Sequence, residues 1–302
     1  MTAGDDAPPE SLPPASRSPE SLYPPGGPSS ARTTYVPPPP HVPTVFENQK
    51  ARVLAFIEHL GEIAPLIGGT AKAVFKRPFE FDSTVYQMES LGVRSMGIVA
   101  VSSLFIGMVM TIQFAFGLRR FGGLEYIPRV VVLSFARELA PTLTAVIVGG
   151  RIGSGMAAEV GAMNVTEQVD AIRALGADPV KKLVVPRVVA AILVMPILGI
   201  FAFALGTLGA IFVCRFQFGI SEEYFMQSAL ETLQMSDFLS GVAKTPVFGL
   251  IISIVGCHFG LRTTGGTEGV GLSTTRTVVV VSIAILVADF MMTKLAIVLT
   301  PS

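Results

Sequence analysis

The chain has 302 residues, of which 50% are hydrophobic and only 15% charged, and its mean hydropathy is +0.61. Soluble domains carry about 25% charged residues, so the composition excludes an ordinary soluble domain. The 22 basic and 22 acidic residues balance, which gives no reason to expect a nucleic-acid partner. The apolar residues form continuous blocks of the length that a membrane-spanning helix needs, rather than the short alternating segments of a β-barrel. We therefore predict an all-α polytopic membrane protein.

Residues 1–44 contain thirteen of the 22 prolines, together with many Ser and Gly residues. Such a composition cannot bury a core, so we predict a disordered, Pro-rich cytoplasmic tail. In residues 45–80, apolar residues recur at helical spacing between charged ones, which is typical of an amphipathic helix lying in the membrane interface. The remaining residues, 81–302, hold about five spans, predicted near 93–118, 126–158, 183–212, 242–261 and 277–298.

Cysteine and histidine give no sign of a disulfide or a metal site. Cys214 and Cys257 lie inside apolar runs, where single cysteines usually serve packing, and the three histidines are scattered along the chain. We expect no metal.

Basic residues near the ends of the spans predict the orientation. Ten Lys or Arg side chains lie on one side if the N-terminus is inside, against four or five on the other. This bias favours a cytoplasmic N-terminus and, after five spans, a C-terminus outside. The "LRRFG" loop at 118–122 opposes this bias, because it carries two Arg residues on the predicted outer side.

Two charged residues, Arg137 and Glu138, lie about eight residues into the second span. A charge near the bilayer centre is costly, so such residues face protein or water. Pro141 has no N–H for the carbonyl of Arg137, so the helix should open or kink there. These features predict a polar patch in a cavity; the alternative is a structural ion pair. In the fifth span, Asp289 should take its partner from a neighbouring helix, because Lys294 is poorly placed.

One face of the first span presents a large apolar wall with a single amide and small gaps. Such a wall suits lipid acyl chains, although ordinary packing would produce the same pattern. The residues are Met110, Gln113, Phe114, Gly117, Leu118 and Phe121.

The most polar stretch of the second half of the chain, "NVTEQVDAIRALGADPVKK" at 164–182, lies between the second and third spans. Asn164 and Glu167 have the spacing of a capping box, and Gly176 and Pro179 are typical helix terminators. We therefore predict a helix from Val165 to Leu175, too short to span. It is either an ordinary connector or a docking surface for a cytoplasmic partner.

The segment "RELAPTLTAVIVGGRIGSGMAAEVGAMNVTEQVDAIRALGADPVKKLVVPR" at 137–187 closely resembles the MlaE/YrbE family. These proteins are permease subunits of ABC transporters that move lipids together with MCE proteins. "FIGMVMTIQ" and "GVGLSTTRTVVVVSIAILVADF" also fit the family, and the likeness covers about residue 46 to the C-terminus.

The resemblance implies that the short charged helix is a coupling helix that docks on a separate ATPase. The residues implied in that contact are Val165, Glu167, Gln168, Asp170, Ala171, Arg173, Ala174 and Asp178. It also implies a homodimer, phospholipid held between the two copies, and an MCE protein on the outer side.

No phosphate-binding motif GxxxxGK followed by Ser or Thr occurs in the chain, so we expect ATP to be bound by the partner. We expect no cofactor and no enzymatic activity in this chain. The resemblance implies either a bacterial inner membrane or a chloroplast envelope, and we expect the bacterial inner membrane because the tail lacks the Arg-rich pattern of a transit peptide. Two alternatives remain: an ion-driven secondary transporter with Arg137, Glu138 and Asp289 as its relay, and a scaffold that only anchors partners.

Overall fold

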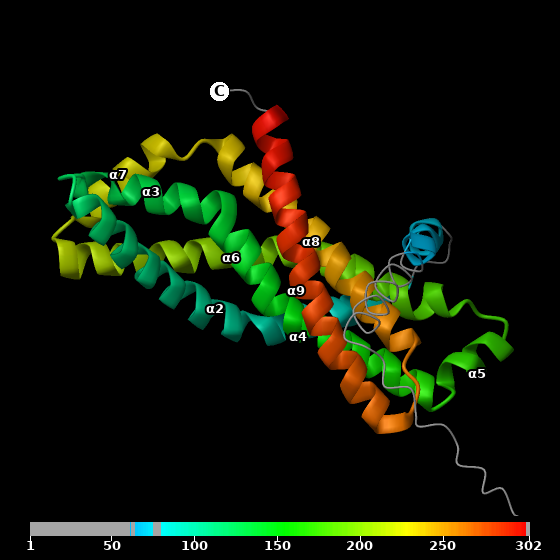
Figure 1. Ribbon diagram of the computed structural model, residues 1–302. Helices are drawn as coiled ribbons and strands as arrows, with labels where there is room; N and C mark the ends of the chain where they lie inside the picture. The colour runs from blue at the N-terminus through cyan, green and yellow to red at the C-terminus, as the bar shows by residue number, and fades with distance from the viewer. Residues whose placement is uncertain (1–60, 62–63, 75–79, 300–302) are drawn as a thin grey trace, which may run out of the picture. The chain divides into compact units, whose positions relative to one another are not determined.

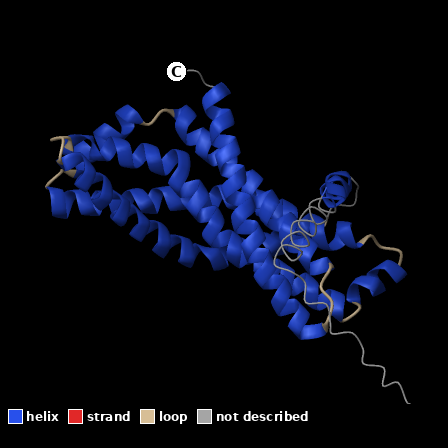
Figure 2. Ribbon diagram, in the orientation of Figure 1, coloured by secondary structure: helices blue, strands red, loops and turns tan. Residues whose placement is uncertain are grey.

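The computed structural model describes residues 61, 64–74 and 80–299. The predicted Pro-rich tail lies outside the described residues, as does much of the predicted amphipathic region. Within that region, residues 64–74 are helical. Throughout the described part of the chain, secondary structure is helical without a strand (Figure 2). The prediction of an all-α protein is therefore confirmed.

Within the described residues, five helical segments are long and apolar enough to cross a membrane, as predicted (Figure 1). Their bounds are α2 (Phe81–Arg119), the second span from Leu124 to Val165, the third from Val180 to Phe218, α8 (Met235–Leu261) and α9 (Gly266–Leu299). The third span consists of the π-helical turn η4 (Val180–Val184) and α6 (Val185–Phe218). Two short helices, α5 (Gln168–Ala174) and α7 (Glu222–Thr232), connect spans.

Several helices extend beyond their predicted apolar cores. A capping box between Gln234 and Asp237 begins α8 seven residues before the predicted start of the fourth span. The Gly-rich stretch after α8, which the sequence suggests is a linker, is helical from Gly266 onwards. The chain turns at Gly265 and Gly266, whose φ angles are +86° and +66°, and then enters α9 directly.

The second span changes its helical geometry near its middle. It begins with a 3₁₀ turn, η2 (Leu124–Tyr126), continues as α3 (Ile127–Ser134), passes through the π-helical turn η3 (Phe135–Leu139) and ends as α4 (Ala140–Val165). In η3 the N–H of Ala140 donates to the carbonyl of Phe135, five residues back. The predicted opening near Arg137 is therefore present, as a π turn just before Pro141.

Helix packing joins these spans closely. The most extensive contact is between α2 and α6, while α4 packs on both α8 and α9. A Cβ atom on Gly107 would overlap the carbonyl of Gly206, so α2 and α6 approach more closely than larger residues allow. The apolar core runs through this packing and includes Val99, Phe135 and Ile252, each almost fully buried.

Candidate functional site

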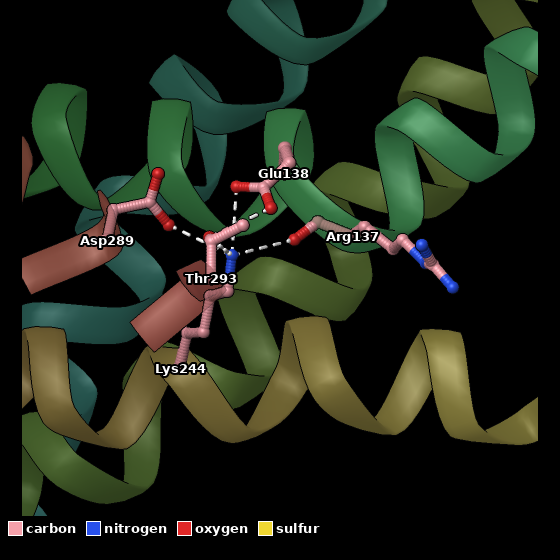
Figure 3. Close-up of polar contacts among 5 residues, drawn as sticks. All are labelled: Arg137, Glu138, Lys244, Asp289 and Thr293. Carbon is pink, nitrogen blue, oxygen red and sulfur yellow. Dashed lines mark hydrogen bonds and ion pairs between the residues drawn. The ribbon is translucent and has the colours of Figure 1, made fainter. Parts of the chain in front are cut away.

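A buried lysine lies where η3, α8 and α9 meet. The side chain of Lys244, on α8, is 3% exposed. Its Nζ lies 2.8 Å from Oε2 of Glu138, 3.1 Å from Oδ1 of Asp289 and 2.6 Å from Oγ1 of Thr293. The Thr293 hydroxyl lies 2.9 Å from Oε1 of Glu138 and donates to it. Figure 3 shows these groups converging on the ammonium, so three separate elements meet at one charge.

The π turn supplies a further acceptor for the ammonium. The carbonyl oxygen of Arg137 lies 3.2 Å from Nζ of Lys244. Pro141 has no N–H to offer this carbonyl, so the oxygen is free to accept from a side chain. The close approach also depends on Gly241, one helical turn before Lys244, because a Cβ there would overlap the carbonyl of Ala136. We call Lys244, Glu138, Asp289, Thr293 and the Arg137 carbonyl the lysine cluster.

The side chain of Arg137 leaves the lysine cluster in another direction (Figure 3). Its Nε lies 2.9 Å from Oδ1 of Asp237, which also caps the start of α8. The guanidinium is half-exposed, whereas the Asp237 side chain is 9% exposed. The helix cap therefore fixes the carboxylate that in turn orients Arg137.

These groups line a pocket of about 500 Å³ between η3, the start of α8 and the end of α9. Arg137, Glu138 and Lys244 contribute charged groups, while Leu133 and Ile297 contribute apolar ones. With Asp237 and Asp289, the charged residues around it comprise two basic and three acidic side chains. A cavity with a polar side and an apolar side is suited to an amphipathic ligand.

The structure does not bring the predicted apolar wall of α2 into this pocket. The wall lies on α2, whose main partner is α6, and half-buried Met110, Phe114 and Leu118 pack against the apolar core. Gln113 and Phe121 are exposed, as is Gly117. Arg137 and Glu138 face α8 and α9 instead, because η3 packs on α8. Use of both groups of residues by one lipid stays a prediction.

The short helix predicted at 165–175 is present as α5, although it is shorter than expected, and its coupling role stays a prediction. Asn164 does not cap it: the residue lies within α4, and its amide donates to the carbonyl of Thr263, 3.0 Å away. Val165 also belongs to α4. The chain then turns at Glu167, whose φ of +60° is unusual for a residue with a side chain.

The end of α5 matches the sequence prediction. Gly176 has a φ of +78°, and its N–H bonds the carbonyl of Arg173 while that of Ala177 bonds Ile172, which is the Schellman pattern. Val169 is buried, whereas Leu175 is 85% exposed. The helix therefore keeps one side against the protein and presents the other to its surroundings.

The other predicted coupling residues are exposed on α5 or beside it. Asp170 and Arg173 pair with each other at 2.7 Å. Gln168 donates to the hydroxyl of Thr166, and the carboxylate of Asp178 accepts the N–H of Val180, so it caps the next helix. Ala171 and Ala174 are exposed.

Sequence reasoning missed three members of the polar network. Lys244 falls at the predicted border of the fourth span, near residue 242, and the sequence pattern assigns no role to Asp237 or Thr293. The expectation that a neighbouring helix would supply a partner for Asp289 is correct, and that partner is Lys244. The cost of burying Asp289 within a span was the only signal that pointed to a missing cation.

The fold and site define a multi-pass helical membrane protein with a charged cavity among its spans. The family described as Permease MlaE matches residues 84–295. Protein TRIGALACTOSYLDIACYLGLYCEROL 1, chloroplastic, of Arabidopsis thaliana is 40% identical over 78% of this chain and 67% of its own. A protein named Probable ABC transporter permease protein from Rickettsia typhi is 38% identical over 80% of this chain and 93% of its own. One of the same description from Synechocystis is 43% identical over 70% of this chain and 81% of its own.

The chain therefore belongs to the MlaE permease family. The prediction of an ABC lipid-transporter permease is confirmed at the level of this family. The chain is a multi-pass membrane protein, with five apolar helices of spanning length in the part that the structure describes.

Proposed function

We propose that this chain is the transmembrane subunit through which an ABC transporter moves phospholipid, with ATP bound and hydrolysed by a separate chain. The observation that carries the proposal is the lysine cluster beside the pocket of about 500 Å³. Charged residues inside a span are costly, and they commonly line substrate pathways. Arg137, half-exposed at the pocket, can meet a phosphate, while the apolar lining can meet acyl chains.

The coupling partner in this proposal is a cytoplasmic ATPase that binds α5. Support comes from the exposed side of the helix, where Leu175 offers an apolar contact beside the ion pair of Asp170 and Arg173. The αL conformation of Glu167 fixes the turn between α4 and α5 at some energetic cost. Conformations of this kind often occur where function constrains the backbone.

A second copy of the chain and an outer MCE protein complete the proposed assembly. Supporting a second copy, α9 is mostly unburied although it is apolar, with Ile283, Leu286 and Phe290 each more than half exposed. The end of α9 lines the pocket, so a partner there would also enclose a bound lipid. We place the assembly in the bacterial inner membrane, with the N-terminus and α5 in the cytoplasm and the C-terminus outside.

Charge reversal on α5 tests the coupling. The double variant Glu167→Lys/Asp170→Lys should lose the copurifying ATPase, or lose ATP-driven lipid transfer in reconstituted vesicles while ATP hydrolysis continues. Folding should survive, because both residues are exposed and such charges contribute little to stability. The matched control is Glu125→Lys/Glu223→Lys, two exposed acids at the opposite ends of the spans.

Two outcomes would contradict the proposal. Full ATPase binding and transfer in the α5 variant would remove the coupling role. Lipid transfer that needs an ion gradient and continues without ATP would favour the secondary transporter, with Glu138 and Asp289 in its relay.

A further inference from the structure

A second pocket, of about 560 Å³, lies between α2, α4 and α9, toward the ends of these helices nearest α5. It shares no lining residue with the pocket beside the lysine cluster. Polar and charged side chains dominate one part of its lining: Gln87, Arg94, Arg151, Ser154, Glu159 and Thr274. Neither the predicted site residues nor the proposed transport route accounts for this concentration of polar groups.

The charge of this second pocket is positive. Its one lining carboxylate, Glu159, lies 3.0 Å from Nη2 of Arg187, whose side chain is only 5% exposed, so that charge is already offset. Arg151 donates to the hydroxyl of Ser95 at 2.7 Å. Within the described ranges of the chain, neither Arg94 nor Arg151 pairs with a carboxylate. Two guanidinium groups are therefore available to an anion.

The charge pattern of α2 places the second pocket at the edge of the membrane. The first turns of α2 carry Asp82, Glu89 and Arg94, but the next 24 residues, 95–118, carry no charge. At about 1.5 Å per residue these span about 36 Å, enough for a hydrocarbon core of about 30 Å. Arg94 consequently lies at the headgroup level on the α5 side. Arg151 lies at the same level, because it bonds Ser95.

We propose that the second pocket binds the phosphodiester of a glycerophospholipid taken from the leaflet on the α5 side. Guanidinium groups bind phosphate oxygens in a forked geometry that favours them over ammonium groups. The hydroxyls of Ser154 and Thr274 and the amide of Gln87 can bond the remaining headgroup oxygens, while Leu91 and Met156 form apolar wall. Free phosphate has the same oxygens, but a site at headgroup level meets lipid at far higher local concentration.

Phospholipid binding at the second pocket does not depend on the transport function proposed above. A role of this pocket in loading substrate does rest on that function. Photocrosslinking tests the binding directly. A diazirine amino acid replaces Ser90, which lines the second pocket, and the full-length protein is reconstituted in phosphatidylglycerol bilayers. Phospholipid adducts at Ser90 should be abundant. They should fall about tenfold in Arg94→Gln/Arg151→Gln, because charge-assisted bonds are lost.

Three comparisons control the experiment. Arg119→Gln removes an exposed charge from the other end of α2 and should leave the adducts unchanged. Arg94→Gln alone, at an exposed residue, should lower the adducts without disturbing the fold, which thermal unfolding would check. Millimolar inorganic phosphate should compete poorly.

Any of three results would overturn the proposal. Equal labelling by diacylglycerol, which has no phosphate, would show that the pocket selects acyl chains. Complete competition by inorganic phosphate would identify a soluble anion as the ligand. Unchanged adducts in the double arginine variant would remove the two guanidinium groups from any binding role. Lipid transfer, measured in parallel, distinguishes these results from failure of the transport function, because binding here can fail while ATP-driven transfer persists.

Discussion

Replacing Lys244 with Met tests the central charge of the lysine cluster. The variant leaves the carboxylates of Glu138 and Asp289 facing the same space without their shared cation. Removing one member of a buried ion pair costs about 3–5 kcal/mol. Glu138 is 38% exposed and Asp289 16% exposed, so water screens part of this loss. We therefore expect a decrease of about 3 kcal/mol in the free energy of unfolding.

Equilibrium unfolding of the full-length protein in lipid–detergent mixtures measures this decrease. The triple variant Lys244→Met/Glu138→Gln/Asp289→Asn should recover most of the stability, because it leaves no unpaired charge. Its lipid transfer should nevertheless stay lost, since the three charges of the lysine cluster are gone. The single and triple variants should therefore differ in stability while both lack lipid transfer.

An exposed ion pair provides the reference for this measurement. The side chains of Arg129 and Glu231, which pair α3 with α7, are 42% and 53% exposed. Glu231→Gln, which removes the ion pair but keeps the bond from Arg129 to the hydroxyl of Ser228, should therefore cost less than about 1 kcal/mol. If Lys244→Met costs no more than Glu231→Gln, or if the triple variant is no more stable than Lys244→Met alone, the lysine is not the balancing charge that the geometry indicates.

Two further predictions concern close packing and orientation. Gly241→Ala should force α8 away from η3, destabilise the protein by about 1–3 kcal/mol and lower transport, whereas Gly97→Ala, whose Cβ meets nothing within 4 Å, should be neutral in the same unfolding and transfer assays. Equal effects of the two Gly→Ala variants would exclude a tight contact between Gly241 and η3. Cysteines introduced at Thr267 and Gln217 should react with an impermeant reagent from the cytoplasmic and outer sides respectively; the reverse pattern would invert the proposed orientation.

The class of fold followed from the sequence because lipid imposes simple requirements on composition and length. Continuous apolar runs placed all five spans, and Pro141 correctly indicated an opened helix near Arg137. The ends of the helices were less predictable. Local capping residues, such as Gln234 and Asp237, extend α8 beyond its apolar part, so Lys244 lies inside a helix rather than at its border.

Long-range contacts caused the other differences. Asn164 has the local sequence of a helix cap, but its amide instead bonds a carbonyl 99 residues away, and α4 continues through it. Similarly, the polar network around Lys244 joins segments separated by up to 155 residues. A single sequence shows which charges need partners but does not say which distant segment supplies them.

Because α4 is continuous, this part of the second span can move as one rigid helix. Its 26 residues extend without a break from the π turn to the turn before α5, a length of about 39 Å. A π turn lacks the regular bonding of its neighbours and is a natural pivot. A tilt of about 10° there would carry the α5 end through about 7 Å. A rearrangement of less than an ångström around Lys244 can therefore produce a displacement of several ångströms at α5. Conversely, a displacement of α5 can move the groups around Lys244, because the same rigid helix connects them.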